Sequence, residues 1–414
     1  MNNQTSKPAQ PVGPLAGMTV LDLTQIMAGP FCTMLLADMG AEVVKVERPG
    51  GGDDSRRLGP PFVAPDGPSQ TGGESTAFLG LNRNKKSVVL DLKTPRAVDV
   101  VRRMAAKADV LVENWRPGTM EGLGLGYRDL SALNPALVYC SITGFGLTGP
   151  YSQRGGFDLV AQGMSGLMSI TGHPDQPPVK VGVPIADLNA GALAAYGVLS
   201  AYIHSLKTGR GQYLETSLLE AALSYTVYES MLYLNAGHLS GPLGSSHRLA
   251  APYQALRTKD GYINVGAANQ ANWERFVKVI GREELLADAR FRVNSDRMQN
   301  LGVLVPELER TLVTRTRSEW LEALEKAGVP AGPIYDMAEV WADEHVLARG
   351  MRAEAPHASL GQVSHIGVPV KMSDTPASVR VAAPVLGQHT DEVLAWAGYS
   401  PSEIAVLHRD KVAG

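Results

Sequence analysis

The sequence predicts an α/β protein whose main part is a doubly wound parallel sheet, joined to a smaller α+β domain. Two patterns and the length support this prediction. Apolar strand-like runs alternate with helix-length segments in the first part of the chain. Beyond Gly209-Arg210-Gly211 the pattern changes to a long helix and a hairpin. The 414 residues, 44% of them apolar, are enough for two or three domains with at least one large core.

Five strands are predicted in the first part, because each is a short apolar run bounded by turn residues or helix signals. They are Thr19–Leu23, Glu42–Glu47, Ser87–Leu92, Asp109–Asn114 and Leu137–Thr143. Helices are expected after Pro30 as far as Met39, and from Pro95 to Lys107, since proline is tolerated in a first turn. The Gly-, Pro- and Asp-rich stretch from Pro49 to about Gly73 is predicted to be an irregular loop. Strands separated in this way by helices favour a parallel sheet.

The middle of the chain is predicted to form the smaller domain. A helix is expected from Ser217 to Ala236, and a Gly/Ser/His loop follows to about Ala250. Asp260-Gly261 separates two alternating runs, which is a strong hairpin signal. The runs are Tyr253 to Thr258 and Tyr262 to Ala268. Thr316-Arg317-Ser318-Glu319 has the pattern of a capping box, and Gly328 is expected to stop that helix.

The C-terminal part, from about Pro330, is predicted to consist of turns, short strands and a final helix beginning near Thr390. Its position after the smaller domain suggests that it packs back on the first domain. Internal repeats are absent from the sequence.

Bulk properties exclude several classes of protein. A net charge of −3 gives no reason to expect nucleic acid or an anionic membrane as partner. Two distant cysteines, Cys32 and Cys140, indicate a reducing compartment rather than a disulfide framework. The nine histidines have no metal-ligand spacing, so a metal site is not expected. Met1–Gly13 lacks the features of a secretory signal, and Ala190–Leu206 suits a buried helix better than a membrane span. A cytoplasmic protein is therefore expected.

One segment concentrates the chemistry. The apolar run beginning at Val181 is strand-like and ends at Asp187, and a small-residue helix pattern covers Ala192 to Leu206. Open α/β sheets present catalytic groups at the carboxyl ends of strands, which favours Asp187 as a nucleophile. An aspartate of ordinary pKa, about 3.9, is already ionised at neutral pH. Aspartate is equally a good helix N-cap, and the spacing alone leaves both interpretations open.

A series of motifs resembles one family, the class III coenzyme A transferases, which also contains formyl-CoA transferase, carnitine CoA-transferase and α-methylacyl-CoA racemase. The matching segments follow the family's order from about residue 14 to the C-terminus. They are Thr24–Pro30, Ala37–Gly50, Asn82–Ser87, Val112–Gly118, Ser141–Gly146, Gly155–Asp158, the Asp187 segment, Ala251–Tyr253 and Leu386–Thr390. Such an ordered series is highly specific.

The resemblance implies a Rossmann-like large domain made from both chain ends, with a small α+β domain inserted between them. The expected boundaries are 14–220, 221–331 and 332–414. It also implies an interlocked homodimer. Asp187 aligns with the family's catalytic aspartate, which would form an anhydride and then a thioester with coenzyme A (CoA).

Further site residues follow from the same resemblance. Asp158, Gln25 and Met27 are expected to support the nucleophile; Asp158 would either raise its basicity or act as a structural acceptor. CoA, a substrate here, is expected to contact Met27, Ala28, Arg48, Leu90, Leu92, Asn114 and Trp115. Arg48 would lie near the adenine, against the alternative of a solvated arginine. Lys85 and Lys86 are either phosphate ligands or ordinary surface lysines. No nucleotide cofactor is expected, since a Gly-x-x-x-x-Gly-Lys loop is absent from the sequence.

Departures from the family's patterns narrow the set of reactions expected of this chain. Racemase members carry a histidine where this chain has Phe157, which cannot transfer a proton. Formyl-CoA transferase has a glutamine at the position of Met27 and glycines at Gly244–His247, so a formyl-CoA/oxalate pair is the alternative. The overall pattern resembles members that move CoA from succinyl-CoA to a dicarboxylate. The free carboxylate of such an acceptor would need a cationic partner, for which Arg83, His247 and Arg248 are the candidates.

Two rival classes remain testable. A dinucleotide-dependent oxidoreductase is suggested only by Gly122–Gly126, which follows a helix-like stretch rather than a strand. An acyl-CoA-binding protein without catalysis would keep its full function when Asp187 is replaced by alanine.

Overall fold

The computed structural model describes residues 13–414. Its contacts divide the chain into two compact units. The first comprises the chain up to Leu167, Lys180–Met231 and Glu344–Gly414, and the second Met168–Val179 and Leu232–Asp343. The second unit begins and ends about a dozen residues later than the small domain predicted from the sequence. It also takes in residues 168–179. In the part of the chain that the structure describes, no helix has the length and apolar character to span a bilayer.

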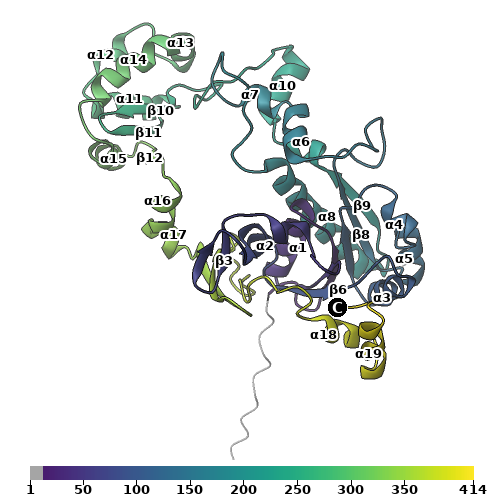
Figure 1. Ribbon diagram of the computed structural model, residues 1–414. Helices are drawn as coiled ribbons and strands as arrows, with labels where there is room; N and C mark the ends of the chain where they lie inside the picture. The colour runs from purple at the N-terminus through teal and green to yellow at the C-terminus, as the bar shows by residue number, and fades with distance from the viewer. Residues whose placement is uncertain (1–12) are drawn as a thin grey trace, which may run out of the picture. The chain divides into compact units, whose positions relative to one another are not determined.

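The first unit is built on a six-stranded parallel sheet in the order β6-β2-β1-β7-β8-β9 (Figure 1). Renumbered by their place in the chain, these strands have the order 3-2-1-4-5-6, which is that of a doubly wound sheet. The chain reverses direction across the sheet between β1 and β7, and this switch point is where such folds bind ligands. The strands are β1 (Thr19–Leu23), β2 (Glu42–Glu47), β6 (Lys85–Val89), β7 (Val110–Glu113), β8 (Val138–Thr143) and β9 (Tyr213–Ser217).

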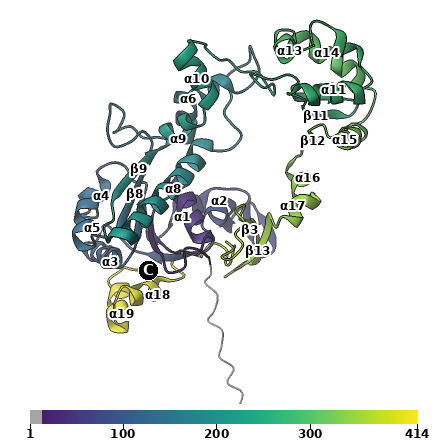
Figure 2. The same cartoon turned by 180° about the vertical axis from the view of Figure 1, so that it is seen from behind.

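Helices cover both faces of this sheet. α8 is the longest and runs alongside β8 and β9 (Figures 1 and 2). The helices of this unit are α1 (Ala28–Asp38), α2 (Thr76–Leu81), α3 (Pro95–Ala105), α4 (Thr119–Gly122), α5 (Tyr127–Leu133), α6 (Asp158–Met164), α8 (Ile185–Thr208), α9 (Leu218–Ser224), α17 (Glu344–Ala348), α18 (Thr390–Trp396) and α19 (Pro401–Arg409). Two further helices, α7 (Leu167–Ile170) and α10 (Val227–Ala236), lie at the boundaries between the units.

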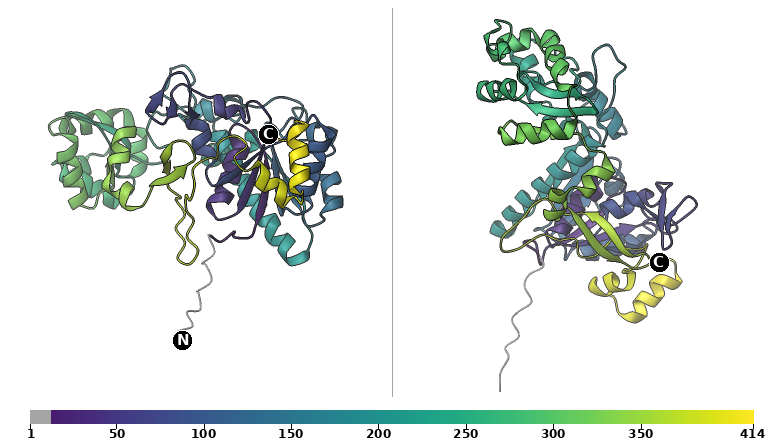
Figure 3. Two further views of the ribbon diagram at one scale, coloured as in Figure 1. Left: turned by 60° about the horizontal axis from the view of Figure 1, so that its bottom comes forward. Right: turned by 90° about the vertical axis from the view of Figure 1, so that its left-hand side faces the viewer.

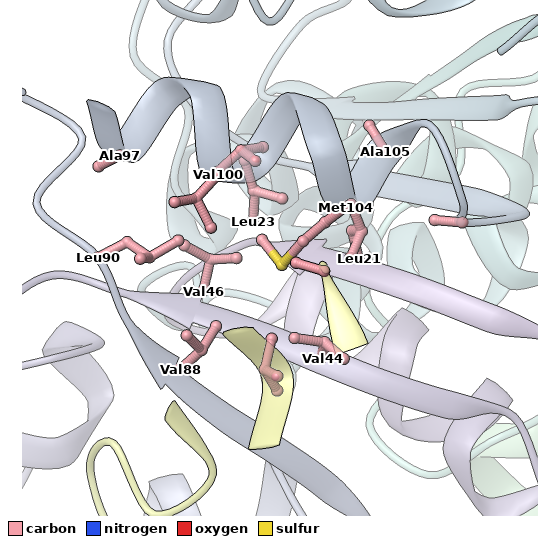
Figure 4. Packing of buried hydrophobic residues seen from close by; sticks show 14 of the residues in the cluster. Leu21, Leu23, Val44, Val46, Val88, Leu90, Ala97, Val100, Met104 and Ala105 are labelled. Carbon is pink, nitrogen blue, oxygen red and sulfur yellow. The ribbon is translucent and has the colours of Figure 1, made fainter. Parts of the chain in front are cut away.

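The core under α3 shows why the alternating pattern folds in this way. Apolar side chains of β1, β2 and β6 point to the face that α3 covers with Val100 and Met104 (Figure 4). These side chains are almost fully excluded from solvent, and burial of each stabilises the fold by about 1.5–3 kcal/mol. The C-terminal helices α18 and α19 add Val393, Leu394 and Leu407 to the same cluster. The C-terminal part therefore contributes to the core of the first unit.

The second unit has its own core. The hairpin β10 (Tyr253–Thr258) and β11 (Gly261–Gly266) forms at Asp260-Gly261 as predicted, and β12 (Ala331–Pro333) adds a third antiparallel strand. Thr316 caps α15 with the predicted capping box. Helices pack on this sheet (green in Figure 3). They include α11 (Gln270–Val279), α12 (Glu284–Ala287), α13 (Asn294–Gln299), α14 (Leu301–Leu312) and α15 (Arg317–Lys326), with α16 (Met337–Ala342) at the end of the unit.

Several elements differ from the prediction. The loop after Pro49 contains a 3-10 turn, Asp54–Arg57, and a small antiparallel sheet of β3 (Phe62–Ala64), β4 (Gly67–Ser69) and β5 (Glu74–Ser75). The helix predicted for 217–236 is split into α9 and α10, and one C-terminal helix is two. β9 and β12 are absent from the prediction. Each forms by pairing with a neighbouring strand, β9 with β8 and β12 with β11. β13 (Arg352–His357) and β14 (Gly361–Ile366) are the short strands expected in the C-terminal part.

Candidate active site

Asp187 lies in the first turn of α8, as the third residue of the helix. The strand expected before it does not form, since residues 181–184 are outside regular structure. Pro184 occupies the N-cap position and has no amide hydrogen to donate to a ladder. Asp187 is therefore presented by a helix start and not by the end of a strand.

The cap of α8 comes from elsewhere in the chain. Oδ1 of Asp158, on α6, accepts a hydrogen bond from the Ala186 amide at 2.9 Å. The N-cap interpretation of Asp187 is thus wrong, because Asp158 satisfies the helix end across 28 residues of sequence. This leaves the Asp187 carboxylate without a capping role.

A close helix contact places Asp187 beside the start of α1. A Cβ on Gly191 would lie 2.5 Å from the Ala28 carbonyl oxygen and 3.2 Å from the Cys32 nitrogen, so only glycine allows this approach. Asp187 precedes Gly191 by four residues and shares its helix face. The first turn of α8 consequently faces the N-terminus of α1, where Met27 and Ala28 lie.

The surroundings of Asp187 make it an unusually basic carboxylate. Burial raises its pKa from 3.8 to about 7, and the negative charge of Asp158 adds to the effect. The ordinary aspartate assumed from the sequence is fully ionised at pH 7, whereas this one is about half ionised. Asp158 is both a structural acceptor and a source of like charge, so its two predicted roles coexist.

The loop between β1 and α1 is fixed by side chains from three other strands or loops. The Asn114 amide makes two hydrogen bonds with the Gln25 backbone, at 2.8 and 2.9 Å. Asp53 accepts the Ile26 amide at 3.0 Å, and this holds Ile26 at a φ of 69°. Lys45, itself paired with Asp53, donates to the Thr24 carbonyl at 2.8 Å. Asn114 was predicted to border the nucleotide. In the structure its side-chain amide uses these two hydrogen bonds to hold the loop.

A pocket of about 410 Å³ opens at the carboxyl ends of β1, β2, β6 and β7, next to the switch point. Four residues predicted to contact CoA line it together: Arg48, Leu90, Leu92 and Trp115. Lys93 lines it as well and was not predicted. The available signal was that Lys93 directly follows the predicted strand Ser87–Leu92, because ligands of such sheets bind outside the carboxyl ends of the strands.

The two lysines proposed as phosphate ligands have other partners. Lys85 is fully buried and its Nζ contacts Asp22, Asn82 and the Pro30 carbonyl, each at 2.9 Å. Lys86 forms ion pairs with Glu42 and Glu392, both at 2.8 Å. The pocket therefore uses Lys93 and Arg48 as its cationic side chains, and Arg48 is half-exposed beside Asp54.

The three acceptor candidates are distributed over both units. Arg83 is buried in a bidentate pair with Asp38 and also donates to the Ile366 carbonyl, which makes it a structural arginine. His247 and Arg248 belong to the second unit. Nδ1 of His247 accepts the Leu249 amide at 3.0 Å, so its Nε2 carries the proton of the neutral ring. Arg248 donates to the Gly241 carbonyl at 2.7 Å.

Metal-binding groupings of three or more His, Cys, Asp or Glu side chains do not occur within residues 13–414.

Known proteins resemble this chain over most of its length. The profile of CoA-transferase family III matches residues 15–390. The chain is 42% identical to the human succinyl-CoA:glutarate CoA-transferase over 92% of its length and 86% of the relative's. It is 38% identical to a succinate–glutarate CoA-transferase of Agrobacterium fabrum, covering 92% of this chain and 95% of that one.

A solved structure supports the same assignment. The crystal structure of a CAIB/BAIF family protein from Brucella suis superposes with a TM-score of 0.83 at 37% identity, over 93% of this chain and 99% of that chain. The protein belongs to CoA-transferase family III and is an enzyme of the CoA-transferase type.

Proposed function

We propose that this enzyme moves CoA from succinyl-CoA to a dicarboxylic acid, with Asp187 as the covalent nucleophile. One observation carries the proposal. Asp187 is a poorly solvated carboxylate whose pKa is raised to about 7, and it faces the loop that leads to the pocket at the carboxyl ends of the strands. The names of the relatives from human and Agrobacterium fabrum support the succinyl donor and a dicarboxylate acceptor.

The proposed reaction needs no external energy source. An Asp187 carboxylate oxygen attacks the thioester carbonyl of succinyl-CoA, the C–S bond breaks, and an aspartyl–succinyl anhydride and CoA thiolate result. The thiolate sulfur then attacks Cγ of Asp187, which releases succinate and leaves an aspartyl-CoA thioester. The acceptor carboxylate repeats both steps in reverse, so acceptor-CoA leaves and the Asp187 carboxylate is restored. Splitting one transfer into four steps is the gain of covalent catalysis.

The proposed position of CoA follows from the pocket. Its adenine lies between Leu90, Leu92 and Trp115, and Arg48 and Lys93 contact its phosphates, since guanidinium and ammonium groups pair well with them. The pantetheine arm then runs along the Gln25–Met27 loop toward Asp187. In this arrangement Met27 and Ala28 border the sulfur.

Recognition of the acceptor's free carboxylate is assigned to His247 and Arg248. The loop that carries them is tied to its own unit by Ser245 and Ser246, whose hydroxyls bond to the Ala255 amide and to Gln254. A fixed loop holds the Nε2–H donor of His247 and the Arg248 guanidinium in place better than a free loop does. Arg83 is left out of this proposal because Asp38 neutralises it.

Two further properties are proposed. A homodimer is supported by exposed apolar side chains along one stripe of α8, where Tyr196, Ile203 and Leu206 are 71%, 52% and 67% exposed. A cytoplasmic location is supported by two buried, unpaired cysteines, which suit a reducing compartment.

The test uses succinyl-CoA with glutarate and with valerate, which has the same chain length and lacks the second carboxylate. We expect glutaryl-CoA to form, with valerate at least about ten-fold slower because valerate has no second carboxylate to pair with the proposed binding group. Asp187→Ala should lower transfer at least about a thousand-fold while CoA binding stays nearly unchanged. Hydroxylamine added during turnover should mark Asp187. Transfer at full rate in Asp187→Ala would refute the mechanism, and equal rates for both acids would refute the dicarboxylate.

A further inference from the structure

The segment that leads into α8 is held by a residue that the mechanism above does not use. Gln162, on α6, is fully buried. Its Oε1 accepts the Val181 amide at 2.9 Å, and its Nε2 donates to Asp158 at 2.7 Å, with a longer contact to the Val183 carbonyl at 3.4 Å. Every strong bond of this amide therefore goes to a group that lies next to the nucleophile in sequence or in space.

Only a glutamine-like side chain fits these partners. The Val181 amide can only donate and the Asp158 carboxylate can only accept, so the bridging side chain must offer one acceptor and one donor. This also fixes the orientation of the amide, since the reverse one would face donor with donor. Asp158 and Gln162 lie four residues apart on one face of α6, which brings both to the start of α8.

The resulting chain of hydrogen bonds runs from Val181 through Gln162 and Asp158 to Ala186. It holds both ends of the segment that precedes Asp187 without any strand ladder. It also holds Asp158 in place as the like charge that faces Asp187.

We infer that Gln162 is a positioning residue for the nucleophile, which holds Asp158 and the 181–186 segment in the arrangement that Asp187 needs for transfer. This inference rests on the proposed function, since it takes Asp187 as the nucleophile. Gln162 acts through Asp158 and the backbone and does not touch the substrate.

Other ionisable groups near α8 are accounted for as follows. They belong to the elements that pack on its length: Cys32 and Asp38 on α1, Asp158 on α6, Glu220 on α9, Tyr139 and Cys140 on β8, and Tyr213 and Glu215 on β9. Asp38 is neutralised by Arg83, and Glu220 accepts the Ser217 hydroxyl. Asp158 is the charge that raises the pKa of Asp187.

The test compares Gln162→Leu with Asn134→Leu as matched control. Asn134 is also an amide that clamps backbone, through Ala105, Ala108 and Ala136, but in loops that do not touch this segment. The titration of Asp187 is followed by carbon-13 NMR of protein labelled at the aspartate carboxyl carbon, with Asp187→Asn to assign the signal. Transfer kinetics are measured on the same samples.

In Gln162→Leu, Asp158 loses a donor that favours its ionised form, and water reaches the loosened segment. Both effects weaken the causes of the raised pKa, so Asp187 should titrate at least about one pH unit lower than in the wild type. We expect kcat to fall about ten-fold or more, with the KM for succinyl-CoA changed by less than about three-fold. In the double variant Gln162→Leu/Asp158→Asn, the shift in the Asp187 titration should be smaller than the sum of the shifts in the two single variants.

If Gln162→Leu does not fold, Gln162→Glu gives a second test. It keeps both hydrogen bonds only while the new carboxyl is protonated, so its rate relative to the wild type should fall as the pH rises. An Asp187 titration in Gln162→Leu equal to that of the wild type, with a rate loss no larger than in Asn134→Leu, would overturn the inference. For Gln162→Glu, a constant rate ratio across pH would do the same. The NMR titration needs no turnover, so a wild type that fails to transfer CoA would refute the proposed function separately.

Discussion

Two aspartates of the first unit, the fully buried Asp22 and the partly exposed Asp187, have opposite surroundings. Asp22, on β1, contacts Lys85 at 2.9 Å and Lys45 at 3.9 Å and accepts the hydroxyls of Thr24 and Thr33. Although burial opposes ionisation, these partners hold the pKa of Asp22 well below its usual range. Asp187 has only Asp158 as a charged neighbour, and burial raises its pKa to about 7.

The comparison separates scaffold from reactivity. A buried carboxylate that is paired on all sides is a fixed structural element, and here it connects β1, β2 and β6 and holds the start of the loop that carries Met27. A buried carboxylate left without a cation retains a strong tendency to bond to an electrophile. The same residue type thus performs two tasks, and its neighbours decide which.

The largest expected effect is on stability at Asp22. Asp22→Asn leaves Lys85 and Lys45 buried with less negative charge around them, and should lower the free energy of unfolding by about 3–5 kcal/mol at pH 7. Because the folded pKa of Asp22 is depressed, the difference from the wild type should shrink as the pH falls below the ordinary aspartate value of 3.8. Urea unfolding at pH 7 and at about pH 2.5, which lies below the ordinary aspartate pKa, measures it. If Asp22→Asn leaves the free energy of unfolding unchanged, this network does not stabilise the sheet.

Replacing Asp187 is expected to change the free energy of unfolding in the opposite direction. Its raised pKa means that ionisation opposes folding, so the stability it contributes is present at low pH and lost as the pH rises through about 7. Asp187→Asn should therefore be more stable than the wild type at pH 8.5, by about 2 kcal/mol, and equal to it near pH 4. Thermal unfolding at the two pH values checks this. A variant less stable than the wild type at pH 8.5 would contradict it.

The smallest expected effect concerns Asp158. Since Asp187 must be ionised to attack, kcat/KM should fall below about pH 7 in the wild type. Asp158→Asn removes the like charge but keeps an oxygen acceptor for Ala186, and should move this acidic limb down by about one pH unit. Glu220→Gln, on α9, is the matched control and should leave the limb in place. An unmoved limb in Asp158→Asn would show that burial alone sets the basicity of Asp187.

Local sequence signals determined a large part of this fold. Short apolar runs predicted the strands β1, β2, β7 and β8. The Asp260-Gly261 turn predicted the hairpin, and the Thr316 capping box predicted the start of α15. Each of these signals depends on neighbours within a few residues. The motif series also pointed to Asp187, and it selected Arg48, Leu90, Leu92 and Trp115, which the structure gathers at one pocket.

Tertiary structure decided what those signals left open. Val181–Pro184 has the apolar character of a strand, but the side chain of Gln162 takes the place of a ladder partner. Asp187 is not the helix cap because Asp158, 28 residues before Ala186 in the sequence, accepts the Ala186 amide. Lys85 is buried because it pairs with Asp22 inside the sheet. Burial and charge pairing depend on residues far apart in the chain, so the raised pKa of Asp187 appears only when the chain has folded.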